Sequence, residues 1–282
     1  MPKVVATVES LRREVAAARR ERQRIGLVPT MGALHEGHMS LVRASNDECE
    51  FTAVSIFVNP TQFAPGEDLD RYPRTFEADL NKLAECRVAV VFAPSAEHVY
   101  GPDHATWVEV DRIGRRWEGE HRPTHFRGVA TVVLKLFNMV GPDVAFFGQK
   151  DYQQAALIRR MVADLDVPVE IRVCPTVRES DGLAMSSRNA YLSPGARRRA
   201  TVLWKSLCLA REMVAQGERD ADVLHRRMRE VIASAEDSRI DYLALADPDT
   251  LEPVEQIDGP TLAALAVTIE NTRLIDNEIL HP

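Results

Sequence analysis

The chain has 282 residues, of which 45% are hydrophobic and 27% are charged, a composition typical of a soluble globular enzyme. Its formal net charge of −7 argues against a general nucleic-acid-binding protein, and it means that an anionic ligand needs a site built from local cations. Four widely spaced cysteines predict reduced thiols in a cytoplasmic protein, and no apolar run approaches the length of a membrane span.

Helical and extended patterns alternate up to about residue 174. The first helix is expected from Ser10 to Arg24, with Ser10 as its N-cap. A buried strand at Leu27 and a helix from His38 follow. Further strands are predicted at 51–58, 88–92, 143–147 and 169–173, and further helices at 75–86, 129–140 and 152–165. Residues 114–128 are predicted to form a mobile loop or lid. This alternation predicts an α/β, Rossmann-like parallel sheet with helices on both faces.

The pattern changes from about Thr176. A polar loop is followed by two predicted helices and two short strands, at 194–216, 221–234, 240–245 and 265–270. We therefore predict two domains, an α/β domain over residues 1–175 and a smaller α+β domain over residues 176–282. The smaller domain is expected to act as a lid that closes over the first.

The central stretch is LVPTMGALHEGH, residues 27–38. A strand that enters a helix through a glycine turn is a common phosphate site, because backbone N–H groups and the helix dipole point at the anion. His35 and His38 can add hydrogen bonds to such an anion. Two core histidines remain an alternative. A zinc site is disfavoured, because the pattern His-Glu-x-x-His requires histidine where Met39 stands.

Polar groups follow three of the predicted strands. The three sets are His35 with His38, Asn59 with Gln62, and Lys150 with Asp151. The carboxyl ends of parallel strands meet at one edge of a sheet, so these sets are expected to converge there. Each set alone has an ordinary explanation, as turn chemistry or as a surface lysine. A later segment, Met185–Arg188, offers two hydroxyls and a guanidinium that suit a phosphate clamp, although a polar turn is the alternative.

Several reaction classes lack their motifs. The chain contains no P-loop, no G-x-G-x-x-G and no G-x-S-x-G pattern. The groups that remain as candidates for binding and catalysis are imidazoles, a lysine, an arginine and amides. This inventory suits attack on a phosphorus with pyrophosphate as the leaving group, where catalysis depends mainly on positioning and charge stabilisation.

Six blocks together carry a resemblance to a known family. They are PTMGALHEGH (29–38), SIFVNPTQF (55–63), YPRT (72–75), HFRGVATVV (125–133), FFGQKDYQQ (ending at Gln154) and DGLAMSSRN (181–189). In order and spacing they resemble the pantoate–β-alanine ligases, a family within the HxGH nucleotidylyltransferase superfamily. The resemblance covers nearly the whole chain, whereas His-x-Gly-His alone would indicate only the superfamily.

The resemblance implies a HIGH-type nucleotidyltransferase fold and a two-step reaction. The carboxylate of (R)-pantoate attacks the α-phosphorus of ATP, which gives pantoyl adenylate and pyrophosphate. The amine of β-alanine then attacks the acyl carbon and releases pantothenate and AMP. The resemblance also implies Mg²⁺ carried by the ATP phosphates rather than by a protein metal site, a cytoplasmic homodimer, no nucleic-acid or membrane partner, and a role in coenzyme A biosynthesis.

The resemblance also assigns residues. The expected catalytic residues are His38, as proton donor, with His35, Lys150 and Arg188. ATP is expected to contact Pro29, Met31, Gly32, Ala33, Leu34, His35, Glu36, Gly37, His38, Gly148, Gln149, Lys150, Asp151, Val177, Met185, Ser186, Ser187 and Arg188. Pantoate and β-alanine are expected to contact Gln62, Gln154, Asn59 and Tyr72. Gln149 stands where many relatives carry glutamate, so the resemblance leaves its role open.

Two other functions compete with this interpretation. A nucleotidylyltransferase with a phosphorylated substrate would need cations for the second phosphate, whereas the expected acid pocket offers the amides of Gln62 and Gln154. A catalytically silent nucleotide-binding protein would show at least one eroded motif, and none of the six blocks is eroded.

Overall fold

The computed structural model describes residues 1–64 and 66–282. The chain divides into two compact units. The first comprises Met1–Gly148 and Gln153–Pro175, and the second comprises Gln149–Tyr152 and Thr176–Pro282. The short segment Gln149–Tyr152 groups with the second unit, although it precedes Gln153–Pro175 in the chain. Its backbone carbonyls and the Tyr152 hydroxyl bond to residues of that unit. No helix among the described residues combines the length and apolar character needed to cross a membrane.

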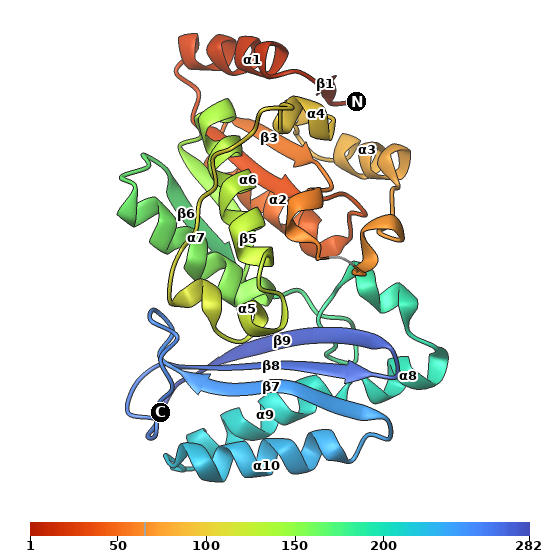
Figure 1. Ribbon diagram of the computed structural model, residues 1–282, viewed down its shortest axis with the longest axis vertical. Coiled ribbons are helices and arrows are strands. Elements are labelled where there is room, and N and C mark those ends of the chain that lie inside the picture. The colour runs from red at the N-terminus through yellow and green to blue at the C-terminus, as the bar shows by residue number, and fades with distance from the viewer. Residues whose placement is uncertain (65) are drawn as a thin grey trace. The chain divides into compact units, whose positions relative to one another are not determined.

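The first unit is built on a six-stranded parallel sheet with the strand order β1-β4-β3-β2-β5-β6 (Figure 1). Its strands are β1 (Lys3–Val5), β2 (Ile25–Thr30), β3 (Phe51–Ile56), β4 (Val90–Phe92), β5 (Val144–Gly148) and β6 (Glu170–Cys174). The predicted parallel sheet is confirmed. The sequence analysis missed β1, because three residues are too few to show an alternating pattern.

Helices connect these strands. They are α1 (Val8–Arg20), α2 (Glu36–Glu48), α3 (Phe76–Ala84), α4 (Ala96–Val99), α5 (Glu118–His121), α6 (His125–Val140) and α7 (Tyr152–Asp164), with 3₁₀ turns at Pro60–Gln62, Asp68–Asp70 and Ile113–Arg115. Helix α1 begins before Ser10, and the expected N-cap is wrong. Thr7 is the cap, since its hydroxyl accepts the Ser10 N–H at 3.2 Å. Helix α2 begins at Glu36, which places His38 inside its first turn.

The core of the first unit explains the apolar run that enters the central motif. Leu27 and Val28 of β2 are each no more than 1% exposed although they point to opposite faces, so this strand is covered on both sides. Val28 lies in one cluster with Val42 of α2 and Leu83 of α3. Helices α1 and α6 pack against each other and against the sheet on the other side. A central strand of this kind holds the turn that follows it firmly.

Residues 114–128, expected as a mobile loop, are largely helical. They include a 3₁₀ turn, helix α5 and the start of α6, which begins at His125 rather than at residue 129. The buried side chain of Gln153 donates to the carbonyls of Ile113 and Arg116, at 2.8 and 2.7 Å, and accepts the Glu118 N–H at 3.2 Å. The sequence of the segment gives no sign of these hydrogen bonds, because their partner, Gln153, lies well outside it.

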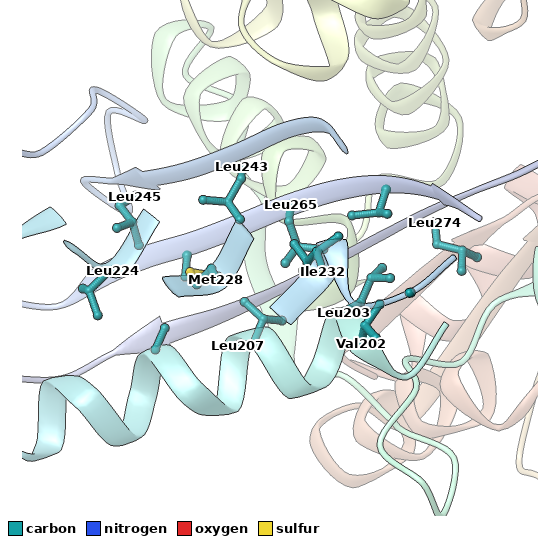
Figure 2. Packing of buried hydrophobic residues seen from close by; sticks show 14 of the residues in the cluster. Val202, Leu203, Leu207, Leu224, Met228, Ile232, Leu243, Leu245, Leu265 and Leu274 are labelled. Carbon is teal, nitrogen blue, oxygen red and sulfur yellow. The ribbon is translucent and has the colours of Figure 1, made fainter. Parts of the chain in front are cut away.

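The second unit is a three-stranded antiparallel sheet with two long helices along one face (Figure 1). Its elements are α8 (Pro194–Arg199), α9 (Val202–Ala215), α10 (Ala221–Ala233), β7 (Ser238–Ala246), β8 (Thr261–Ile269) and β9 (Thr272–Leu280), with 3₁₀ turns at Gln149–Asp151 and Ser187–Tyr191. The single helix expected over 194–216 is wrong, since it is interrupted at Ala200–Thr201. Figure 2 shows the core, where Leu207, Met228 and Ile232 meet Leu265.

Candidate active site

The turns that follow β2 and β3 lie side by side in the first unit, because these strands are neighbours and parallel. The Gln62 amide Nε2 lies 2.9 Å from the Met31 sulfur, so an expected pantoate contact lies against an expected ATP contact. Strand β5 pairs with β2 on its other side and ends at Gly148. The lysine that follows, Lys150, belongs to the second unit.

The turn after β2 has a left-handed backbone held by a buried carboxylate. Gly32 has φ +86°, and Ala33 has φ +51°, a conformation that costs energy for any residue with a Cβ. Asp79 of α3, 1% exposed, accepts the Ala33 N–H at 2.9 Å and the Leu34 N–H at 2.8 Å. The Thr75 hydroxyl donates to the same carboxylate at 3.2 Å. These three bonds offset the strain and fix the entry into α2.

The two histidines hold each other's backbone. The His35 Nδ1 accepts the Gly37 N–H, and the His38 Nδ1 accepts the His35 N–H, each at 3.2 Å. An accepting Nδ1 places the proton of a neutral imidazole on Nε2. The ring centroids are 4.1 Å apart. The first turn of α2 therefore presents two Nε2–H donors at the positive end of a helix dipole, an arrangement that suits an anion.

The turn after β3 is organised by Asn59, which is 1% exposed. Its Oδ1 accepts the Tyr100 hydroxyl at 2.9 Å, and its Nδ2 donates to the Gln62 Oε1 and to the Gly128 carbonyl, each at 3.2 Å. Burial raises the pKa of Tyr100, so its hydroxyl stays a donor at neutral pH. Asn59 thus sets the orientation of the Gln62 side chain rather than offering its own amide to solvent.

The backbone of Gln62 is held from the other side by two residues. His125 donates from Nδ1 to the Gln62 carbonyl at 2.9 Å, and Arg122 donates to it at 3.3 Å. Burial, together with the Arg122 charge, lowers the pKa of His125 to about 4, so this imidazole is neutral at physiological pH. Glu67 pairs with Arg122 through two oxygens at 2.7 Å each. The cation beside Gln62 is therefore neutralised by a carboxylate.

Tyr72 and Gln154 are the other residues of the first unit that are expected to contact a substrate. Tyr72 is 7% exposed and packs edge-on against Phe63, with ring centroids 6.0 Å apart. Gln154 is half-buried in the first turn of α7. Contact of either residue with a substrate remains a prediction.

In the second unit, the loop that carries the Ser-Ser-Arg sequence folds back on itself. The Met185 N–H donates to the Val177 carbonyl at 3.0 Å, so these two expected nucleotide contacts are adjacent. The Ser186 hydroxyl accepts the Arg188 N–H at 3.2 Å and begins the 3₁₀ turn that carries the guanidinium. The Asn189 amide closes the loop by donating to the Ala184 carbonyl at 3.1 Å.

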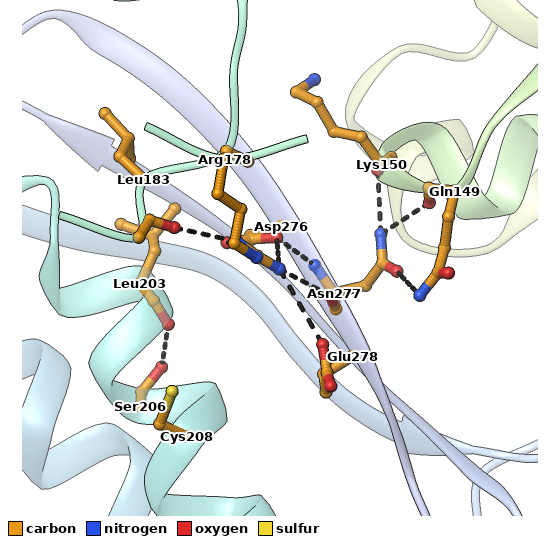
Figure 3. Close-up of polar contacts among 12 residues, drawn as sticks. Gln149, Lys150, Arg178, Leu183, Leu203, Ser206, Cys208, Asp276, Asn277 and Glu278 are labelled. Atoms are coloured by element: carbon orange, nitrogen blue, oxygen red, sulfur yellow. Dashed lines mark hydrogen bonds and ion pairs between the residues drawn. The ribbon is translucent and has the colours of Figure 1, made fainter. Parts of the chain in front are cut away.

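Lys150 lies in the 3₁₀ turn Gln149–Asp151, where its ammonium is 3.6 Å from the Asp151 carboxylate. The side chain of Asn277 on β9 contacts this turn (Figure 3). The neighbouring Asp276 is 2% exposed and pairs with Arg178 at 2.7 Å. Burial raises the pKa of Asp276, and the Arg178 guanidinium opposes that rise.

A cavity of about 530 Å³ opens beside the histidine turn, between residues of α2 and residues at the end of α3. His35 and Glu36 are the expected site residues that line it. The remaining lining residues are Met39, Arg43, Asn46, Asp47, Lys82, Glu85, Cys86 and Arg87. Cations and acids balance there, and Arg43 pairs with Glu36. The cavity therefore lacks the net positive charge that a triphosphate requires.

The sequence analysis missed Asp79 and Asn277. Asp79 left a signal, since it stands four residues before the buried Leu83 and thus on the apolar face of its helix. A carboxylate on that face indicates a buried partner. Asn277 left no such signal in the sequence, because it and the preceding Asp276 are both buried and interrupt the alternation of a half-buried strand.

An open parallel α/β sheet with a His-x-Gly-His helix start defines the class, a nucleotidyltransferase fold. The family model described as pantoate-beta-alanine ligase matches residues 3–279. A pantothenate synthetase of Moorella thermoacetica is 53% identical over 278 residues, covering 99% of this chain and 98% of the relative. The chain belongs to the pantoate-beta-alanine ligase family, and it is an enzyme of that ligase class.

Solved structures agree with this assignment. The crystal structure of pantothenate synthetase from Thermus thermophilus is 46% identical with a TM-score of 0.94, over 99% of this chain and 100% of that chain. A pantoate-beta-alanine ligase from Francisella tularensis, complexed with beta-gamma ATP and beta-alanine, is 31% identical with a TM-score of 0.79, over 99% of this chain and 98% of that chain.

Proposed function

We propose that this enzyme joins (R)-pantoate to β-alanine in an ATP-dependent reaction through a pantoyl-adenylate intermediate, in pantothenate and coenzyme A biosynthesis. The observation that carries the proposal is the pair of Nε2–H donors on His35 and His38 at the start of α2, beside the Met31–Gln62 contact. Family membership and the ATP and β-alanine in the Francisella tularensis relative support the same reaction.

In the first step, a pantoate carboxylate oxygen bonds to the α-phosphorus while the bond from that phosphorus to the bridging oxygen breaks. Pyrophosphate leaves with the bonding electron pair. His38 donates a hydrogen bond from Nε2 to the departing oxygen, with His35 beside it. Lys150 and Arg188 offset the phosphate charge, the arginine through a planar fork of donors.

In the second step, the β-alanine amine attacks the acyl carbon, AMP leaves with the mixed-anhydride oxygen, and the new amide nitrogen loses a proton. Gln62 and Gln154 hydrogen-bond pantoate. The intermediate hydrolyses if water reaches it, so we propose that the second unit closes as a lid.

The groups around Gln62 suit the rival nucleotidylyltransferase reaction less well. A second phosphate on the substrate would require an unneutralised cation beside Gln62. Arg122 is a cation that contacts the Gln62 carbonyl, and the two carboxylate oxygens of Glu67 already pair with it. A polar acid without a phosphate group is the better match for the Gln62 amide, which Asn59 orients.

Magnesium is proposed to arrive on the ATP phosphates. Among the described residues, no three His, Cys, Asp or Glu side chains gather closely enough to hold a metal ion. Phosphate oxygens are hard ligands that Mg²⁺ prefers, and it commonly binds through them. A cytoplasmic homodimer is proposed from the family resemblance alone, and light scattering of the purified enzyme tests the dimer.

The test is a His38→Ala variant. We expect pantoate-dependent exchange of pyrophosphate into ATP to fall roughly a hundredfold or more, because one transition-state donor is lost. His281→Ala, at an exposed position near the C-terminus, is the matched control. A folded His38→Ala enzyme with near-normal exchange would refute the role. AMP release that does not require both pantoate and β-alanine would refute the overall reaction.

A further inference from the structure

Asn277 places its whole side-chain amide on the turn that carries Lys150. Its Nδ2 donates to the Gln149 carbonyl and to the Lys150 carbonyl, each at 2.9 Å. Its Oδ1 accepts the Gln149 side-chain amide at 3.4 Å (Figure 3). Both amide hydrogens are thus used on consecutive carbonyls. Two bonds of this kind fix the plane and direction of the peptide units on either side of the Lys150 Cα.

The residue before it, Asp276, holds a second segment. Its carboxylate accepts two bonds from the Arg178 guanidinium, at 2.7 and 3.0 Å, and accepts the Asn277 N–H at 2.8 Å. Arg178 also donates to the Gly182 carbonyl at 3.1 Å, and its guanidinium carbon lies 3.6 Å from the centroid of the Trp204 ring. The loop that begins at Arg178 is therefore bonded to the same point of β9.

This loop has little room to shift. Gly182 has φ +91°, and a Cβ there would lie 1.9 Å from the Trp204 ring. The loop then continues to Met185 and the Ser-Ser-Arg sequence. One dipeptide of β9 thus connects the Lys150 turn with the loop that carries Arg188, two segments that are 25 residues or more apart in the chain.

We propose that Asn277 is a positioning residue for Lys150, and that Asp276 links it to the Arg188 loop. The proposal rests on the proposed function, in which Lys150 acts on the ATP phosphates. Asn277 hydrogen-bonds to the turn through two backbone carbonyls and the Gln149 side chain. It fixes the lysine backbone, and through it the starting direction of the ammonium-bearing side chain.

The first measurement is steady-state kinetics with Asn277→Ala and Asn277→Asp. We expect kcat/KM for ATP to fall roughly ten- to hundredfold, because a small misplacement of a catalytic group has an effect of that size. Asn277→Asp keeps the volume but points a carboxylate at two carbonyl oxygens, so it should be the worse of the two. Asn271→Ala and Asn271→Asp make the same changes at an exposed turn position before β9, and should leave the kinetics unchanged.

The decisive measurement is a double-mutant cycle with Lys150→Ala, read by pantoate-dependent exchange of pyrophosphate into ATP. If Asn277 acts through the lysine, Asn277→Ala should cost less than about threefold once Lys150 is absent. Equal losses in the two backgrounds would overturn the proposal, since they would show a general structural role. Asn277→Asp runs in the same cycle, so a folding failure of one variant does not remove the test.

The cycle also separates this proposal from the proposed function. A large effect of Lys150→Ala together with normal kinetics of folded Asn277→Ala would overturn the positioning role and leave the lysine in place. Normal kinetics of Lys150→Ala would instead contradict the phosphate role of Lys150, and the positioning role would fall with it.

Discussion

Two short turns in this molecule are each held by one buried side chain from a distant part of the chain, and the two side chains differ in kind. In the first unit, the Asp79 carboxylate accepts the N–H groups of Ala33 and Leu34. In the second unit, the Asn277 amide donates to the carbonyls of Gln149 and Lys150. One side chain is a charged acceptor for amides, and the other is a neutral donor for carbonyls.

The difference follows from the backbone groups that each turn exposes. A turn that enters a helix presents N–H groups, and a carboxylate is their strongest partner. The turn Gln149–Asp151 presents carbonyls, and a neutral amide can donate to them without adding a further charge beside Lys150. Losing Asp79 leaves the N–H of the buried Leu34 unpaired, together with that of the half-buried Ala33, whereas both carbonyls freed by losing Asn277 lie in a half-buried turn. We therefore expect Asp79 to matter most for stability and Asn277 most for catalysis.

Asp79→Ala should give the largest effect. It leaves the Ala33 and Leu34 N–H groups unpaired, the second at a buried residue, and releases a left-handed turn, so we expect the free energy of unfolding to fall by about 4 kcal/mol. Urea denaturation followed by circular dichroism measures this loss. Asn277→Ala under the same conditions should lose about 2 kcal/mol or less. Equal losses, or a larger loss for Asn277→Ala, would contradict the expectation that Asp79 matters most for stability and Asn277 most for catalysis.

Acid should act on the first unit through His125. The folded-state pKa is about 4, below the ordinary value of about 6.5 in an unfolded chain. Between these values the unfolded chain binds a proton that the folded protein does not, so stability is lost as pH falls through this window. The full loss is on the order of 3 kcal/mol and is complete near pH 4. Unfolding free energies of the wild type and of His125→Gln from pH 7 to pH 4 measure it.

The His125 variant should show a shallower pH dependence, by one proton, over the same range. Its own loss of the bond to the Gln62 carbonyl lowers stability at pH 7, so the comparison concerns the slope and not the absolute value. Parallel curves for the two proteins would show that other groups carry the acid sensitivity.

Two glycines extend the comparison, because each packs against a segment that is expected to bind a different substrate. A Cβ at Gly128 would lie 2.5 Å from the Thr61 carbonyl oxygen, against the Gln62 turn, and a Cβ at Gly182 would meet Trp204. Each alanine variant should lose about 2 kcal/mol of stability, a typical penalty for overpacking. Gly128→Ala should raise KM for pantoate, and Gly182→Ala should raise KM for ATP. Steady-state kinetics with one substrate varied at a time measure both KM values. If Gly128→Ala raised KM for ATP and Gly182→Ala raised KM for pantoate, the expected roles of the two segments would be exchanged.

Local patterns were enough for the parallel sheet and for the histidine turn, because buried strands, glycine turns and helix starts leave their marks within a few residues. They failed where a partner lies far along the chain. The segment 114–128 looks irregular, yet Gln153 fixes it. Strand β9 looks polar, yet Asp276 and Asn277 are buried because Arg178 and the Gln149–Lys150 carbonyls satisfy them. Such pairings depend on the completed fold.

The smallest expected effects test the outer bond of each holding side chain. Thr75→Val removes the hydroxyl that donates to Asp79 at 3.2 Å, and Gln149→Met removes the amide that donates to Asn277 at 3.4 Å. We expect Thr75→Val to lose about 1 kcal/mol, because its acceptor is a buried carboxylate, and Gln149→Met to lose about 0.5 kcal/mol, because its longer bond joins neutral groups. Thermal and urea unfolding resolve these values. A larger loss for Gln149→Met would mean that the neutral turn is the more tightly held of the two.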